Sequence, residues 1–462
     1  MPRKQNIHFE ISERKILLRI FDVFWVLFTL YLVGTFSRFE YFNINSDFWT
    51  WGVVLALYLT VFSSVFELYD LQKASKFDTV LKNVVLTTSV TVLFFLLTPF
   101  LTPVLPENRM QILYFYISII SALLLWRFAY ISLVSSPRFY KRVLIINDSF
   151  DVDVIANQLQ QSDPHYNIIG YINSGGYAGG KSVFQSGLLR FSDEKLTTIV
   201  KENAITEILI SGEHNKSGLN EELLGLLKSG FPVKDYYEVY EEKTGRIPVQ
   251  HIEKDFYKFF YFSKINDNKF YIFSHRFMDV VIASLGMIVG FLLVPFILVG
   301  NFLGNRGSLI YRQERVGRNG EHFHILKFRT MGYDAEQNGA QWAQKNDVRV
   351  TKFGKFLRRA RLDEFPQFYN IFMGEMSLIG PRPERPVFVE ELSEMIPFYD
   401  TRHVIKPGLT GWAQVMADYG NSHGDSLEKL QYDLYYIKHR NLFLDINILV
   451  KTLSTIIFFR GQ

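Results

Sequence analysis

Two adjacent carboxylates, Asp363 and Glu364, stand in the stretch RRARLDEFPQFYN at residues 358–370. Three arginines, Arg358, Arg359 and Arg361, precede them, and a proline follows. Neighbouring like charges repel each other, and burying them without partners is costly. A solvated helix face would explain such a run of charges. The residues that surround this stretch decide between that structural role and the binding of a ligand.

Further cations with restricted positions lie on either side of this stretch. The segment YRQERVGRNGEHFHILKFRTM (311–331) predicts a β-hairpin with its turn at Asn319-Gly320. Lys327 and Arg329 are two residues apart on the return strand, so they share one face, where two cations suit a bound phosphate. Ordinary exposed charges are the alternative. Arg382 stands between two prolines in GPRP (380–383), which restrict its backbone and favour bidentate phosphate binding.

Length and composition limit the kind of protein that carries these residues. The chain has 462 residues, enough for two or three domains, and is 48% hydrophobic and 16% aromatic. A net charge of only +4 argues against a generally basic nucleic-acid-binding protein. The absence of cysteine excludes disulfides and thiolate metal sites. A cleavable signal peptide is not expected, because the first apolar run carries Arg19 and Asp22.

Four apolar segments fill the first third of the chain, at 16–36, 49–66, 83–105 and 110–126. Each is about long enough to cross a bilayer. Lys and Arg are concentrated before the first segment, between the second and third, and after the fourth, which places both ends of this unit in the cytoplasm. A fifth segment, 280–303, contains Pro295 and has basic residues at both ends. A helix that enters the membrane, breaks at Pro295 and returns to the same side fits both observations, and a kinked span is the alternative.

Residues 141–250 alternate between predicted strands and helices. RVLIIN, NIIGYIN and ITEILIS are typical of strands, and 151–161 and 217–229 of helices, which together predict a parallel, Rossmann-like sheet. The first strand is not followed by the glycines of a dinucleotide site. GGYAGGKS, from Gly175 to Ser182, matches the phosphate-loop pattern, but the helix that this mechanism requires does not follow. We interpret it as a glycine-rich loop.

The predicted fold class therefore combines a membrane α-helical part of four transmembrane helices, a Rossmann-like α/β domain, and an α/β monotopic catalytic domain with a re-entrant membrane helix. The predicted boundaries are 1–136 for the helices, 137–250 for the middle domain, 251–271 for a linker and 272–462 for the catalytic domain. The apolar stretch 442–461 is expected either to lie at the membrane interface or to pack against the catalytic domain.

Several short motifs follow the fifth apolar segment in a fixed order: RVG, KFRTM, LDEFPQ, GPRP and KPGLTGWAQV. In this order they resemble the bacterial sugar transferases, the polyprenyl-phosphate phosphoglycosyltransferases of the large monotopic type. The resemblance implies transfer of a sugar 1-phosphate from a UDP-sugar to polyprenyl (undecaprenyl) phosphate with release of UMP. Such a reaction would begin exopolysaccharide, capsule or O-antigen synthesis. The resemblance also implies a multi-pass protein of the bacterial inner membrane, in contact with membrane lipids, with its middle and catalytic domains in the cytoplasm.

The same resemblance assigns roles to individual residues. Asp363 would be the nucleophile that carries the phosphosugar, and Glu364 would hold a Mg²⁺ ion at the donor diphosphate. Some members of the family have serine before the hairpin proline, whereas Val294 precedes Pro295 here, so a hydroxyl cap at the break is absent. The residues expected to bind substrate phosphates are Lys327, Arg329, Arg358, Arg361 and Arg382.

Three other classes of function compete with this prediction. A transporter or flippase for lipid-linked sugars would require polar residues within the membrane segments, and those segments show only Arg19 and Asp22 at one edge. A membrane-tethered sensor would bind a nucleotide in its middle domain, and an inactive scaffold would lack the carboxylate pair. The sugar, the pathway, the role of the middle domain and the oligomeric state, including any homo-oligomer, are not encoded in these motifs.

Overall fold

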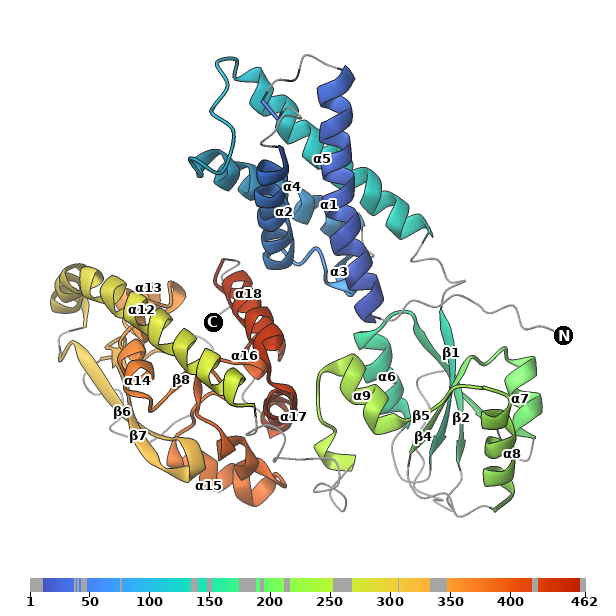
Figure 1. Cartoon of the computed structure of the whole chain (residues 1–462). Helices are drawn as coiled ribbons and strands as arrows, with labels where there is room; N and C mark the ends of the chain where they lie inside the picture. Colours follow the sequence, from blue (N-terminus) through green and yellow to red (C-terminus); the bar gives the residue numbers. More distant parts are fainter. Residues whose placement is uncertain are drawn as a thin grey trace. The chain divides into compact units, whose positions relative to one another are not determined.

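The computed structural model divides into two compact units, Met1–Thr244 and Gly245–Gln462 (Figure 1). It describes residues 11–36, 39, 41–42, 48–74, 77–133, 140–147, 152–173, 188–191, 195–211, 217–251, 268–305, 307–332, 347–417 and 423–457. The glycine-rich loop Gly175–Ser182 and most of the predicted linker lie outside the described residues.

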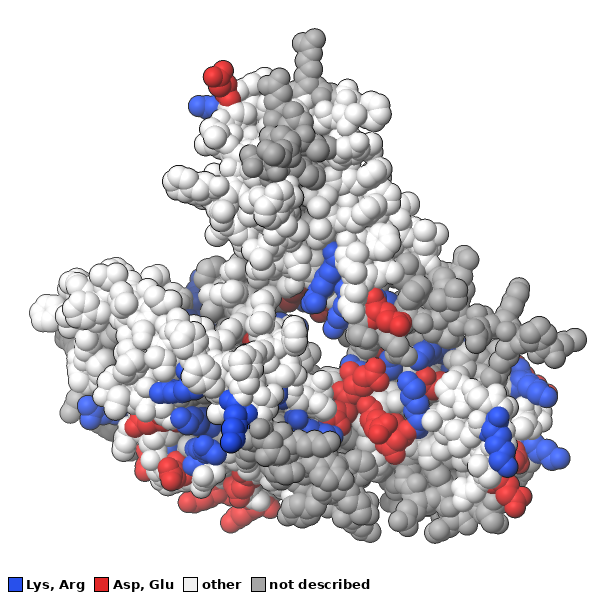
Figure 2. All heavy atoms as spheres, in the orientation of Figure 1, with Lys and Arg blue, Asp and Glu red and all other residues white. Residues whose placement is uncertain are grey.

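The first unit begins with apolar helices. They are α1 (Ile11–Phe36), α2 (Phe48–Val65), the short α3 (Leu71–Ala74), α4 (Phe77–Leu97) and α5 (Met110–Leu133). Within the described residues, α1, α4, α5 and, in the second unit, α12 (Lys269–Gly304) are long and apolar enough to cross a membrane, whereas α2 is shorter. Figure 2 shows that the visible face over α1, α2, α4 and α5 carries few charged side chains.

Two of the predicted segments differ from the helices found. The segment predicted at 83–105 is α4, which begins at Phe77 and ends at Leu97. It ends there because Pro99 disfavours helical geometry in the residue before it. The segment predicted at 110–126 continues to Leu133 as α5, so it contains Arg127.

Arg127 forms an ion pair inside the helical part of the first unit. Its guanidinium Nη2 lies 2.5 Å from Oδ2 of Asp22 on α1, and the two side chains are 1% and 0% exposed. A charge among apolar helices is costly unless it is paired. The expectation that charges within the apolar segments are confined to Arg19 and Asp22 was therefore wrong, because α5 continues past the predicted end at 126 and includes Arg127.

The remainder of the first unit is an α/β domain with a parallel sheet in the order β3-β2-β1-β4-β5. Aliphatic residues of β1 and β4 are fully buried between the helices. The three predicted strands are confirmed as β1, β2 and β4, and the two predicted helices as α6 and α8. The elements are β1 (Lys141–Asn147), α6 (Val152–Ser162), β2 (Tyr166–Asn173), β3 (Leu189–Phe191), α7 (Leu196–Glu202), β4 (Glu207–Ser211), α8 (Ser217–Lys228), β5 (Val233–Asp235) and α9 (Tyr236–Thr244).

A buried cluster of charges joins α1 to this α/β domain within the first unit. The carboxylate of Asp163 accepts from Arg14 of α1 at 2.6 Å and from Lys243 of α9 at 3.0 Å. All three side chains are at most 5% exposed. Since an unpaired buried charge is strongly unfavourable, these contacts hold the first helix and the sheet domain in one unit.

The second unit contains one long helix, a β-hairpin and several short elements. The predicted hairpin is confirmed, and Asn319 and Gly320 adopt positive φ angles of 57° and 80° at its turn. The elements are η2 (Val249–His251), α12, β6 (Ile310–Val316), η3 (Arg318–Gly320), β7 (His322–Phe328), α13 (Lys352–Arg359), η4 (Leu362–Glu364), α14 (Gln367–Met373), β8 (Ser377–Ile379), α15 (Pro386–Met395), η5 (Tyr399–Val404), β9 (Gly408–Thr410), α16 (Trp412–Met416), α17 (His423–His439) and α18 (Leu442–Ile457).

Helix α12 packs against the second unit along both of its halves. In the first half, Arg276 donates to two carbonyls at the end of α14, at 2.8 Å each, and Asp279 accepts hydrogen bonds from β8. In the second half, the ring of Phe353 on α13 lies directly against Gly300. The helix continues through Pro295, so the predicted break is not seen as an interruption of the helix. A proline removes one helical hydrogen bond and clashes with the preceding turn, which favours a kink at this position without ending the helix.

Residues 245–250, which the sequence assigned to the middle domain, belong to the second unit and make contacts there. The indole N–H of Trp412 donates to the carbonyl of Gly245 at 2.9 Å, and the N–H of Ile247 donates to the carbonyl of Gln431 at 3.1 Å. Helix α18 buries Asp445 on one side and exposes Phe443 on the other, so it has both a packed face and an exposed apolar face.

Candidate active site

The carboxylate pair lies on a short turn between two helices. Helix α13 begins at the N-cap Thr351, whose hydroxyl accepts from the N–H of Gly354, and it ends at Arg359. Arg361 then takes a left-handed conformation with φ 58°. A right-handed helix cannot continue through such a residue. The turn η4 follows and α14 starts directly after Pro366, so Asp363 and Glu364 are presented between α13 and α14.

Apolar contacts and one amide fix this turn to the hairpin. A small buried cluster is formed by Ile297 of α12, Phe328 of β7 and Leu357 of α13. Residues on either side of the Asp363–Glu364 pair, called the dyad below, pack against this cluster. The side-chain amide of Asn370 on α14 donates to the carbonyl of His324 at 2.8 Å and accepts from the N–H of Leu326 at 3.1 Å. Strand β7 is therefore held beside α14 in a fixed register, which places Lys327 next to the carboxylates.

Three cations surround the carboxylate of Glu364. Nζ of Lys327 lies 3.6 Å and Nη2 of Arg382 3.4 Å from its Oε1, and Nη1 of Arg361 lies 3.7 Å from its Oε2. Burial would raise the pKa of Glu364, but these three charges outweigh it and hold the pKa at about 2. Glu364 is therefore ionised at any physiological pH.

Asp363 has the opposite electrostatic behaviour. Burial raises its pKa and the neighbouring charge of Glu364 raises it further, while Lys327, Arg358 and Arg361 oppose both effects without cancelling them. The side chain is only 7% exposed. A weakly hydrated carboxylate with a raised pKa is a stronger nucleophile than a free one, so the two neighbouring acids are suited to different tasks.

Lys327 also has a shifted pKa. Burial lowers its pKa to about 8, although the charge of Glu364 opposes this shift. The lysine is thus held as a desolvated cation beside the dyad, where it can neutralise developing negative charge.

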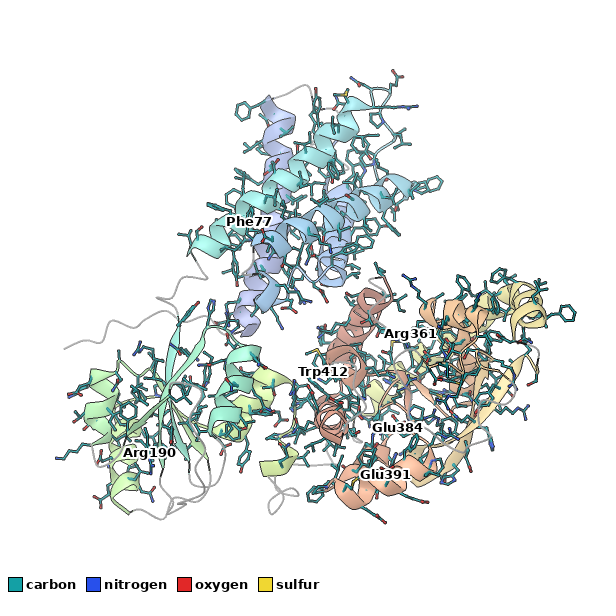
Figure 3. The ribbon with its side chains drawn as sticks, turned by 180° about the vertical axis from the view of Figure 1, so that it is seen from behind. Phe77, Arg190, Arg361, Glu384, Glu391 and Trp412 are labelled. Carbon is teal, nitrogen blue, oxygen red and sulfur yellow. The ribbon has the colours of Figure 1, made fainter. Side chains whose placement is uncertain are left out.

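The structure separates the remaining residues proposed from the sequence. Arg358 donates to the hydroxyl of Thr330 at 3.0 Å and lies close enough to Asp363 to lower its pKa, whereas Arg359 is exposed. Arg329 does not share the orientation of Lys327, because its guanidinium donates to the carbonyl and hydroxyl of Ser308 at 2.9 and 2.7 Å. Figure 3 labels Arg361, which directly precedes the turn η4, and Glu384, which follows Arg382 by two residues in the sequence.

Two site residues were not singled out from the sequence. Arg315 on β6 donates to the carbonyl of Pro383 at 2.9 Å, and Arg402 donates to the carbonyl of Arg382 at 3.0 Å. Arg315 belongs to the RVG motif, which was a usable signal. Arg402 lies in no such motif, and only the tertiary structure brings it to Arg382.

The donor set determines which metal the site would suit. Among the described residues no group of three or more His, Asp or Glu side chains could hold a metal ion. Asp363 and Glu364 provide two neighbouring carboxylates. Mg²⁺ is commonly bound by one or two carboxylates together with substrate phosphate oxygens, so this pair fits Mg²⁺ bound jointly with a diphosphate.

Taken together, the arrangement has a buried carboxyl group, a permanently ionised neighbour and cations on three separate elements. Cations around a pair of carboxylates match the needs of phosphoryl transfer, in which charge must be neutralised as the bond to the leaving group breaks.

Comparison with known proteins identifies related chains. Residues 270–459 match the family described as bacterial sugar transferase. An Aeromonas hydrophila protein named UDP-N-acetylgalactosamine-undecaprenyl-phosphate N-acetylgalactosaminephosphotransferase is 39% identical over 228 residues, which cover 49% of this chain and 52% of that protein. A Xanthomonas campestris pv. campestris protein named UDP-glucose:undecaprenyl-phosphate glucose-1-phosphate transferase is 35% identical over 214 residues, covering 46% and 43%.

A third relative is matched over most of its length. This Bacillus subtilis (strain 168) protein, named for transfer of N-acetylgalactosaminyl 1-phosphate to undecaprenyl phosphate, is 46% identical over 132 residues, which cover 29% of this chain and 74% of that protein. By contrast, the matches to the first two relatives span about half of their length. The family match at residues 270–459 includes every motif from RVG to KPGLTGWAQV.

Proposed function

Because the chain belongs to the bacterial sugar transferase family, we propose that it transfers a sugar 1-phosphate from a UDP-sugar to a polyprenyl phosphate such as undecaprenyl phosphate. The observation that carries this proposal is the buried Asp363 beside Glu364, with Lys327, Arg361 and Arg382 within 3.7 Å of the Glu364 carboxylate. The products are the polyprenyl diphosphate sugar and UMP, and the reaction would begin exopolysaccharide, capsule or O-antigen synthesis.

In the first step, a carboxylate oxygen of Asp363 attacks the phosphorus that carries the sugar. A bond forms between that oxygen and phosphorus, the bond from phosphorus to the bridging oxygen breaks, and UMP leaves with the electron pair. Lys327 and Arg382 are placed to stabilise the charge that accumulates on the leaving phosphate. In the second step, a phosphate oxygen of the polyprenyl phosphate attacks the same phosphorus and Asp363 is released unchanged.

A Mg²⁺ ion would be held by Glu364 as its protein ligand, with Asp363 next to it. When bound, the ion would neutralise the donor diphosphate. The permanently ionised state of Glu364 suits this role, because a metal ligand must be deprotonated at the working pH.

We also propose that α12 is a re-entrant membrane anchor. Arg276 in its first half and Gly300 in its second half both contact the same unit, which supports entry and exit on one side. The chain has no cysteine, so single cysteines can report its topology. Lys269→Cys and Arg312→Cys flank the helix at exposed positions and should react with a membrane-impermeant maleimide from the same side of sealed vesicles. Labelling from opposite sides would refute the proposal and favour a kinked span.

We further propose that the protein lies in the bacterial inner membrane, with its middle and catalytic domains on the cytoplasmic side. The strand order β3-β2-β1-β4-β5 of the middle domain matches the first five strands of the 3-2-1-4-5-6 order of a doubly wound nucleotide-binding sheet, which supports its description as Rossmann-like. Nothing in its described residues identifies a ligand for it.

The decisive experiment is UMP release by the purified full-length protein with polyprenyl phosphate, Mg²⁺ and a panel of UDP-sugars. Asp363→Asn should abolish release, whereas Glu391→Gln, an exposed acid on α15 labelled in Figure 3, should not change it. Release from one donor would also identify the sugar. Release that persists in Asp363→Asn would contradict the covalent mechanism, and silence of folded wild-type protein with every donor would contradict the proposed function.

A further inference from the structure

The loop that carries Arg382 has few backbone donors of its own. Pro381 and Pro383 lack an N–H, so the loop must be held mainly through its carbonyl oxygens. The carbonyl of Pro381 accepts from the N–H of Gly408 at 2.8 Å, and the carbonyl of Pro383 accepts from Arg315 at 2.9 Å. The carbonyl between them, that of Arg382 itself, accepts from the guanidinium of Arg402 at 3.0 Å.

Arg402 is itself fixed on its other sides. Its Nε and Nη2 donate to the same carboxylate oxygen of Asp433 on α17 at 3.1 and 2.8 Å, and its Nη1 donates to the hydroxyl of Tyr399 at 2.6 Å. Arg402 is 5% exposed and Asp433 is 2% exposed. A guanidinium with these partners is not available to bind substrate, so its effect on the reaction must pass through the loop.

The side chain of Arg382 has the opposite character. It is 39% exposed, and its Nη2 lies 3.4 Å from Glu364. A half-exposed guanidinium on a long side chain loses much entropy when it is ordered at a substrate, unless its backbone is already fixed. The contact from Arg402 fixes that backbone at the residue itself.

We propose that Arg402, held by Asp433, is a positioning residue that clamps the Pro381–Arg382–Pro383 loop and thereby orients Arg382 toward the donor phosphates. This rests on the proposed function for its kinetic consequence, but not for the clamp itself. The cluster of Arg402, Asp433 and the Arg382 carbonyl joins three elements that are distant in sequence, namely η5, α17 and the loop before α15.

The first test measures the loop directly. Arg402→Lys keeps the charge but cannot donate to Asp433, Tyr399 and the Arg382 carbonyl together. Hydrogen exchange in full-length protein should become faster in peptides covering 377–386, and remain unchanged in the hairpin 310–328. Asp433→Asn should accelerate the same loop peptides, and Arg312→Lys, an exposed arginine on β6, should accelerate none. Unchanged exchange at 377–386 in both Arg402→Lys and Asp433→Asn would overturn the clamp.

The second test asks whether the clamp acts through Arg382. Arg402→Lys should lower kcat/KM by about 10- to 100-fold, the value of a hydrogen bond from a charged group. In an Arg382→Ala background the same change should cost less than about twofold, because the group to be positioned is gone. An equal loss in both backgrounds would show a general structural role and refute positioning. Exchange needs no turnover, so wild-type protein that releases no UMP would refute the proposed function while the exchange result still decides the clamp.

Discussion

Replacing Gly286 with alanine should disturb the contact between α12 and the helix that follows the dyad. A Cβ built at Gly286 would lie 2.4 Å from Cδ2 and 2.5 Å from Cγ of Phe368 on α14. Ordinary contact begins at 3.4 Å, so the overlap is roughly 1 Å and involves the base of the ring, which a rotation cannot remove. Overpacking of this kind costs about 1–3 kcal/mol.

Gly290 provides a matched control on the same helix. A Cβ there would meet the ring of Phe365 at 3.4 Å, which is ordinary contact. Alanine is also a better helix former than glycine by about 1 kcal/mol, so Gly290→Ala should be neutral or stabilising. The two variants make the same chemical change four residues apart and differ only in the space available.

Thermal unfolding of full-length protein in detergent, followed by UMP release, measures both effects. Each kcal/mol lowers the midpoint by about 2–4 °C for a domain of about 150–250 residues, so Gly286→Ala should unfold several degrees below wild type. Its turnover should also fall, because α14 begins three residues after Glu364 and moves with the ring. If Gly286→Ala matches wild type in both assays, or if Gly290→Ala is impaired equally, α12 does not pack on α14 in this register.

Three further outcomes are expected. Asp22→Ala should lower the free energy of unfolding by about 3–5 kcal/mol, because it leaves Arg127 buried and unpaired. The double variant Asp22→Ala with Arg127→Met should recover most of the loss in the midpoint of thermal unfolding. An unchanged midpoint in the single variant would contradict the buried pair. Wild-type kcat/KM should decline above pH 8, since Lys327 has a pKa of about 8 and loses its charge as the pH rises through that value. Lys327→Arg stays protonated to higher pH and should lack this decline, so an identical alkaline limb would assign it to another group. Chelation of divalent cations should stop UMP release and Mg²⁺ should restore it, whereas full activity with a chelator would exclude a metal at Glu364.

Local patterns predicted the elements that depend on neighbours in sequence. Asn319-Gly320 between alternating strands led directly to the hairpin, since few residues other than Asn and Gly tolerate two consecutive positive φ angles. The three strands of the sheet domain were recognised because apolar β-branched runs are typical of buried strands. Helix ends were less predictable. The predicted segment 83–105 stays apolar beyond Leu97, where α4 ends, because hydropathy does not detect the backbone restriction that Pro99 places on the residue before it.

The sequence by itself determined that the chain has apolar helices, a parallel α/β domain and a neighbouring pair of acids, and the motif order indicated a sugar transferase. It named Arg358 and Arg361 without separating their roles, and it gave Lys327 and Arg329 a common face. Only the tertiary structure distinguished them. It also paired Asp22 with Arg127 and brought Arg402 to the backbone of Arg382, because the strength of a charge interaction depends on distance and burial, and both are set by elements that meet only when the chain folds.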